Sequence, residues 1–209
     1  MQGKVSSERS AIPPVYVGIG SNRRSKRRSR LGSRPSCCGI VGLKPSRGRV
    51  TVAPVADVLY GGAYDLCVSR TIRDTASYLD ALAGPAPGDP YFAPKPTGSS
   101  WLSLSVVSPP RLRVGFSLKP HPPRPLGYLS MSEQDIDRYN GKWTDAAFMY
   151  PFNISGLPAL SLPLHWSADG LPIGVQFVSH FGDETTLLQL GPVLEQEMSW
   201  RARLPPVCA

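Results

Sequence analysis

Residues 37–50, CCGIVGLKPSRGRV, are the most informative part of the chain, and three glycines and a proline interrupt them. Three glycines divide a short apolar stretch, and glycine allows the tight turns and close backbone approaches that other residues do not. A strand is predicted directly afterwards, at residues 50–53, and Pro54 ends it. Folded structure is therefore expected to begin at about Cys38.

The segment before this run has a different character. Residues 1–36 show no sustained hydrophobic period, and residues 23–34 carry seven basic side chains with no intervening acid. These seven account for all but one of the eight net positive charges, so the rest of the protein is close to neutral. Runs of one charge sign with few apolar residues are typical of disorder. We expect residues 1–36 to be disordered.

A helix is predicted within residues 69–84. Its apolar positions follow helical spacing, at Ile72, Ala76, Leu79 and Ala83. Thr71 is the predicted N-cap, and Asp74 favours the positive end of the helix dipole. Glycine followed by proline ends the helix, residues 85–90 favour turns, and a short strand is predicted at 112–116.

The C-terminal block predicts a pair of strands followed by a helix. Residues 150–164 and 167–178 each contain an apolar strand, and an Asp-Gly turn between them favours a hairpin. Asp183 is predicted to cap a helix. The apolar face of that helix is expected at Leu187, Leu190, Leu194 and Met198. Pro192 lies inside the helix and is predicted to kink or break it, at a cost of about 3 kcal/mol.

These stretches resemble motifs of the amidase signature family. Residues 38–50 are similar to its C-G-x-x-G-L-K-P-[ST]-x-G-R-[VI] run, and residues 70–76 to its R-T-[VI]-R-D-x-A helix start. Residues 151–176 resemble its P-F-N-x-[ST]-G-x-P-A-[LI]-S-[LV]-P and D-G-L-P-[IV]-G-[VL]-Q strands. The resemblance covers residues 37–118 and 150–207. It implies an α/β fold, an incomplete amidase-signature fold with a mixed central sheet flanked by helices.

The resemblance also implies a mechanism, in which one serine attacks the amide carbon, a second serine relays the proton and a lysine acts as base. Backbone N–H groups of a Gly/Ser-rich loop would stabilise the oxyanion. Neither that loop nor a lysine in the family's context occurs before Cys37. Three deletions would bring Ser33 to the position of the nucleophile, and Ser33 is the nearest remnant. Lys44 and Ser46 are expected to be structural, and we expect the chain to be inactive.

Two interpretations of the basic run stay open. The run is either the wrong-frame product of the missing Gly/Ser-rich loop, which we favour, or a selected tail that binds nucleic acid or another acidic surface by neutralising charge. Binding of single strands commonly adds aromatic side chains on which bases stack. The run contains no aromatic residue, which argues against a nucleic-acid partner.

The domain organisation expected is a basic segment at 1–36 and a partial amidase domain at 37–209. Residues 119–127 are rich in proline and stand where the family has the long region that forms much of its pocket, so an internal junction is predicted there.

The parent reaction that the resemblance implies is hydrolysis of a small-molecule carboxylic amide to an acid and ammonia, with no metal or organic cofactor. The four cysteines contain no C-x-x-C spacing, and none lies near a histidine, so no metal site is expected. No apolar run is long enough to span a bilayer, and a cytoplasmic location without membrane contact is expected. The oligomeric state is left open.

Overall fold

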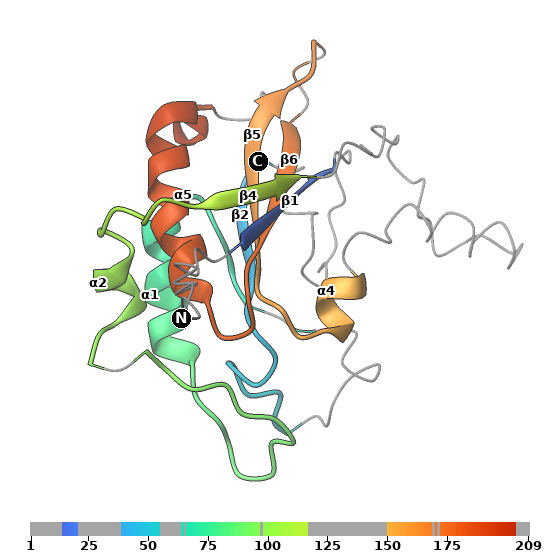
Figure 1. Ribbon diagram of the computed structural model, residues 1–209, viewed down its shortest axis with the longest axis vertical. Helices are drawn as coiled ribbons and strands as arrows, with labels where there is room; N and C mark the ends of the chain where they lie inside the picture. The colour runs from blue at the N-terminus through green and yellow to red at the C-terminus, as the bar shows by residue number, and fades with distance from the viewer. Residues whose placement is uncertain are drawn as a thin grey trace, which may run out of the picture.

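The structure is a computed structural model and describes residues 14–20, 39–54, 64, 66–96, 98–116, 150–168, 170 and 172–203. Six strands form one sheet in the order β3-β2-β5-β6-β1-β4 (Figure 1). The strands are β1 Pro14–Gly20, β2 Val41–Lys44, β3 Val68–Ser69, β4 Arg113–Phe116, β5 Ala159–Trp166 and β6 Pro172–Val178. Only the pair β1 and β4 among these neighbours is parallel, so the sheet is mixed.

Helices cover one face of this sheet. They are α1 Ile72–Leu82, α2 Trp101–Leu104 and α5 Glu184–Met198, followed by the 3-10 helix η2 Trp200–Ala202. The short helix α4, Tyr150–Ile154, lies apart from them (Figure 1). The predicted α/β architecture, a mixed sheet flanked by helices, is confirmed. Among the described helices, none combines the length and apolar character needed to cross a membrane.

The core lies between the sheet and helices α1 and α5. Leu43 of β2 stands opposite Leu160 of β5, which stands opposite Phe177 of β6. Side chains alternate between the faces of a strand, so these three share the helix-facing side. They pack with fully buried side chains of the helices, namely Ile72, Leu79, Leu187 and Leu188. Burying each such side chain contributes roughly 1.5–3 kcal/mol.

The elements with the strongest local signals were predicted correctly. Helix α1 follows Thr71, whose hydroxyl oxygen accepts a hydrogen bond from the N–H of Asp74 at 3.0 Å. The hairpin is confirmed as the antiparallel pair β5 and β6, and the strand predicted at 112–116 is β4.

The strand predicted at 50–53 is wrong. Val50 makes only isolated bridges to Ala83 and Gly84, and the true strand of this region is β2, earlier in the chain. The backbone after β2 is occupied by loop contacts instead. The carbonyl of Arg49 accepts from the N–H of Gly84 at 3.0 Å, and the carbonyl of Gly48 accepts from the N–H of Ala93 at 3.0 Å.

The expectation of disorder over 1–36 is wrong for residues 14–20. They form β1, which pairs with β6 on one side and with β4 on the other. The run Val-Tyr-Val-Gly-Ile within β1 is rich in β-branched residues, which favour strands. The remainder of 1–36 and the junction at 119–127 lie outside the described residues.

Of the predicted kink or break at Pro192, the break is wrong, because α5 continues through this residue to Met198. Tertiary packing explains why the helix persists. Leu187 and Leu188 are fully buried, and Gly191 lies so close to α1 that an added Cβ would stand 2.7 Å from Ile72 Cδ1. Burial of this face outweighs the hydrogen bond that proline forfeits. Met198, assigned to the apolar face, is 42% exposed.

Candidate functional site

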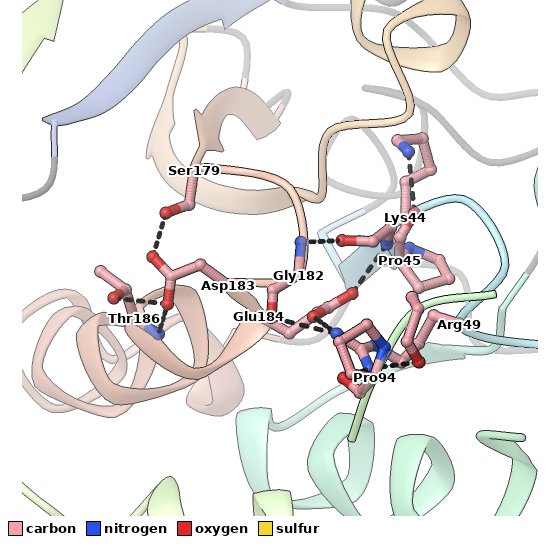
Figure 2. Close-up of polar contacts among 11 residues, drawn as sticks. Lys44, Pro45, Arg49, Pro94, Ser179, Gly182, Asp183, Glu184 and Thr186 are labelled. Carbon is pink, nitrogen blue, oxygen red and sulfur yellow. Dashed lines mark hydrogen bonds and ion pairs between the residues drawn. The ribbon is translucent and has the colours of Figure 1, made fainter. Parts of the chain in front are cut away.

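The loop that follows β2, residues 45–49, carries the most strongly connected polar cluster among the described residues (Figure 2). Ser46 joins this loop to the start of α5. Its backbone N–H donates to Glu184 Oε1 at 2.7 Å, and its Oγ accepts from the backbone N–H of Gly182 at 2.8 Å. Ser46 is 1% exposed. Its hydroxyl therefore serves as an acceptor that holds the α5 entrance.

Arg49 and Glu184 form a buried ion pair. Arg49 Nη2 lies 2.7 Å from Glu184 Oε2, and both side chains are fully buried. The guanidinium also donates to the carbonyls of Ala93, Pro94 and Gly182. Burial alone would raise the pKa of Glu184, but the hydrogen bond and charge of Arg49 and the N–H of Ser46 hold that pKa below its ordinary value. The carboxylate is thus fixed as an anion.

Arg47 binds the end of α4. Its Nη2 donates to the carbonyls of Ile154 at 2.8 Å and of Asn153 at 3.3 Å. The guanidinium also lies over the ring of Tyr91, 4.8 Å from the centroid. The last carbonyls of a helix lack partners within the helix and favour a cation. The loop therefore connects α4, the segment after α1, and α5.

Lys44, the last residue of β2, is a buried amine that is 4% exposed. Its Nζ donates to the carbonyl of Pro45 at 2.8 Å and lies 5.5 Å from the ring centroid of Tyr64. Burial lowers the pKa of Lys44 to about 7, opposed by the charge of Glu184 and assisted by that of Arg47. A lysine with such a pKa has the character of a general base. Within the described part of the chain, however, its amine forms no hydrogen bond with the hydroxyl of Ser46.

The lowered pKa of Lys44 predicts that the protein becomes more stable as the pH rises from 7 to 8.5. An unfolded lysine keeps its proton to about pH 10.4, so above pH 7 the unfolded chain binds more protons and the free energy of unfolding increases with pH. Urea unfolding at pH 7.0, 7.5, 8.0 and 8.5 measures this slope. Lys44→Met should flatten it, whereas substitution of the exposed Lys95 by methionine should leave it unchanged.

Cys67 sets the upper limit of the pH range over which this increase in stability is expected. Burial raises the pKa of its thiol to about 11, and this lowers the free energy of unfolding only above about pH 8.5, where the unfolded thiol ionises. The lowered pKa of Lys44 would be contradicted if the free energy of unfolding of the unmodified chain did not change with pH. It would also be contradicted if Lys44→Met showed the same slope as the unmodified chain.

Asp183 caps α5 as predicted. Its Oδ1 accepts from the N–H of Thr186 at 3.2 Å and from the Thr186 hydroxyl at 2.8 Å, while Oδ2 accepts from the Ser179 hydroxyl. Glu184, the next residue, was missed by the sequence prediction although its spacing places it on the buried face with Leu187 and Leu188. A carboxylate on an apolar helix face indicates a buried partner, here Arg49.

The other predicted residues lie apart from this cluster. Ser33 and the basic run are outside the described residues, so the structure does not place the candidate nucleophile. The sequence predicts half-buried or solvated positions for His165 and His180 rather than catalytic ones, and both are exposed. Within the part of the chain that the structure describes, no group of three or more histidine, cysteine, aspartate or glutamate residues could hold a metal ion.

Comparison with known proteins identifies the origin of this fold. The family model described as Amidase matches residues 35–125 and 117–188, which include the loop, the hairpin and the start of α5. The chain belongs to the amidase family. The resemblance stated from the motifs is thereby confirmed, and the cluster around Ser46, Arg49 and Glu184 is a feature of an amidase-family scaffold.

Two relatives show how the similarity is distributed along the amidase chain. A 6-aminohexanoate-cyclic-dimer hydrolase of Pseudomonas is 26% identical over 303 aligned positions, covering 81% of this chain and 61% of that protein. The alignment is longer than the 209 residues of this chain, so the relative contains segments without a counterpart. A putative amidase of Synechocystis is 42% identical over 87 residues, 41% of this chain and 17% of that protein.

Solved structures share the fold of this amidase-family chain. The structure of a 6-aminohexanoate cyclic dimer hydrolase has a TM-score of 0.66 at 24% identity, covering 92% of this chain and 66% of that chain. A peptide amidase from Stenotrophomonas maltophilia has a TM-score of 0.55 at 15% identity, covering 82% of this chain and 60% of that chain. At these identities the similarity concerns the fold alone.

Proposed function

We propose that this chain keeps the scaffold of an amide hydrolase but does not itself hydrolyse amides. The parent reaction would convert a carboxylic amide and water to an acid and ammonia by the Ser-Ser-Lys mechanism. Ser33 is the nearest remnant of its nucleophile, and a small-molecule amide would be the substrate. The chain covers 61% of the length of the hydrolase relative, and both the activity and its loss are inferences.

The proposal rests on the polar side chains of the motif at residues 38–50, which form hydrogen bonds and an ion pair that hold the fold together. The Ser46 hydroxyl accepts from Gly182, and Arg49 neutralises Glu184. A nucleophilic serine needs an adjacent base within hydrogen-bond reach, whereas the contacts of Ser46 run to the backbone and to the entrance of α5. The motif at residues 38–50 therefore supports the scaffold, and its serine is not placed as a nucleophile.

The internal junction near 119–127 is part of the same proposal. Two observations support it: the family model matches in two segments that meet at residues 117–125, and the hydrolase alignment contains more positions than this chain has residues. Translation of the coding DNA in all three frames tests it, together with the origin of the basic run. A Gly/Ser-rich loop in a shifted frame would identify a decayed or frame-shifted amidase.

Ammonia release from benzamide and short aliphatic amides tests the loss of activity. Enzymes accelerate reactions by about a million-fold or more, so even a weakly working site would be detected. We expect the purified chain to release ammonia at the uncatalysed rate, and Ser33→Ala to leave this rate unchanged. A cooperative thermal transition checks that the chain is folded, and Ser36→Ala serves as the matched variant. Release that Ser33→Ala abolishes and Ser36→Ala preserves would overturn the proposal.

The alternative is a non-catalytic remnant whose arginine-rich segment binds nucleic acid or another acidic surface. The seven basic residues within 23–34, with no acid among them, favour it. Retention on nucleic acid that weakens with salt and disappears when this run is neutralised would support that function. The cytoplasmic location expected from the sequence also belongs to the proposal, and cell fractionation tests it.

A further inference from the structure

The strand β4 lies at one edge of the sheet and is open to solvent. Among the described strands it pairs only with β1 (Figure 1). Arg113 and Val114 are neighbours in β4, so their side chains project from opposite faces of the sheet, and both are exposed. Gly115 is exposed as well. Because glycine has no side chain, that exposure shows that solvent reaches the backbone of the strand.

An accessible edge strand can accept a further strand from another chain. Alternate N–H and C=O groups of an edge strand point away from the sheet, and an extended peptide beside it can bond to them. Natural proteins limit unselective pairing by keeping edge strands short and by placing charges on them. β4 has both devices, since it is four residues long and contains Arg113. A partner of complementary charge would not be repelled by that arginine.

The side chains of β4 select the chemistry of such a partner. Arg111, just before the strand, and Arg113 are both exposed, and neither pairs with a carboxylate of the described residues. Val114 is 47% exposed and offers an apolar contact on the face opposite to Arg113. Opposite charges on neighbouring strands attract and like charges repel. Pairing with β4 of a second copy would bring two sets of arginines together, so the charges favour an acidic partner.

We propose that the edge of β4 binds an extended acidic segment of another protein, in which carboxylate side chains alternate with apolar ones. The main chain of that segment would continue the sheet beyond β4. Its carboxylates would lie on the face of Arg113, and its apolar side chains would lie on the face of Val114, because side chains of neighbouring strands share the same alternation. The proposal is independent of amide hydrolysis, since it uses neither the motif at residues 38–50 nor Ser33.

Binding of a labelled seven-residue peptide that alternates glutamate and valine tests this site. Fluorescence anisotropy with the full chain should show saturable binding, and the same peptide with lysine in place of glutamate should bind at least about fivefold more weakly. A peptide of equal composition with consecutive glutamates controls for the basic run at 23–34, which would bind both arrangements alike. This control should also bind more weakly than the alternating peptide.

Two measurements establish that the peptide binds as a strand. Amide hydrogen exchange at residues 113–116 should slow when the alternating peptide is added, because new hydrogen bonds protect the edge. Methylation of alternate peptide nitrogens removes the donors of one side of the peptide at a time. Of the two peptides methylated on opposite sets, one should lose binding and the other should keep it, since only one side of an added strand faces β4.

Reversal of charge assigns the binding to β4. The double variant Arg111→Glu, Arg113→Glu should bind the lysine peptide at least about fivefold more tightly than the glutamate peptide. The matched variant Arg73→Glu, Lys95→Glu changes the net charge equally at exposed positions and should keep the preference for glutamate. Thermal unfolding checks both variants, and the peptide series with the unmodified chain carries the test if the first is unfolded.

Four results would overturn the proposal. They are absence of saturable binding, equal binding of the lysine peptide, equal binding of the peptide with consecutive glutamates, and an unchanged preference in the folded Arg111→Glu, Arg113→Glu variant. Protection of residues 113–116 that rises with the concentration of the chain alone would also overturn it, because a second copy would then occupy the edge.

Discussion

Replacing Arg49 by leucine is expected to lower the free energy of unfolding by about 3–5 kcal/mol. The substitution leaves the Glu184 carboxylate fully buried without its cation, which lies 2.7 Å away in the native protein. It also removes the donors to the carbonyls of Ala93 and Gly182. Urea unfolding at pH 7 measures the change. Arg111→Leu, at an exposed position, should cost well under 1 kcal/mol.

A double substitution separates the unpaired charge from the loss of packing. Replacing both Arg49 and Glu184 by leucine removes the buried charge together with its partner, and such exchanges are often close to neutral. The double variant should recover part of the stability that Arg49→Leu loses. If the double variant were no more stable than Arg49→Leu, the cost would come from packing, and the ion pair would not be the source of stability.

Gly48→Ala is expected to destabilise the protein by about 2–5 kcal/mol, from the cost of a left-handed backbone and of overpacking. Gly48 has a φ of +72°, and an added Cβ would lie 2.6 Å from the backbone N of Phe92 and from the backbone C of Tyr91. Backbone atoms cannot rotate away as a side chain can. The carbonyl of Gly48 also accepts from the N–H of Ala93 at 3.0 Å, so the two segments are held in contact.

Gly170→Ala is the matched control for this clash. Gly170 has nearly the same φ, +74°, but no atom lies within 4 Å of an added Cβ. Only the conformational cost of about 1–2 kcal/mol should remain there. The difference between the two variants in urea unfolding measures the close approach of the loop to residues 91–92. Equal losses at both glycines would show that this approach contributes nothing.

The parts of the fold that were predicted correctly are marked by signals within a few neighbouring residues. Thr71 and the residue three positions later mark the start of α1, and the Asp-Gly pair of the sequence falls between β5 and β6. Asp183 marks α5 in the same way. Each signal is a cap or a turn acting over a few residues, so it can be read without knowledge of the sheet.

The parts that escaped prediction depend on contacts across long stretches of sequence. β1 pairs with β6, more than 150 residues later in the chain, and its neighbours in sequence are a low-complexity segment. Glu184 is 135 residues from Arg49. Pro192 on its own predicts a break in the helix, but packing against α1 keeps the helix continuous. The structure at these three places depends on burial and strand pairing with distant segments. A single sequence does not show which distant segments come into contact.

Labelling of the chain with an alkyl fluorophosphonate, which reacts with activated serines, tests most directly whether the amidase scaffold has lost its catalytic centre. The intact mass would be measured before and after exposure, with the reagent in excess and the protein folded. The account predicts an unchanged mass, because an unactivated hydroxyl is a weak nucleophile. A stoichiometric adduct that maps to Ser33, and that Ser33→Ala removes, would contradict it and show that an active nucleophile survives.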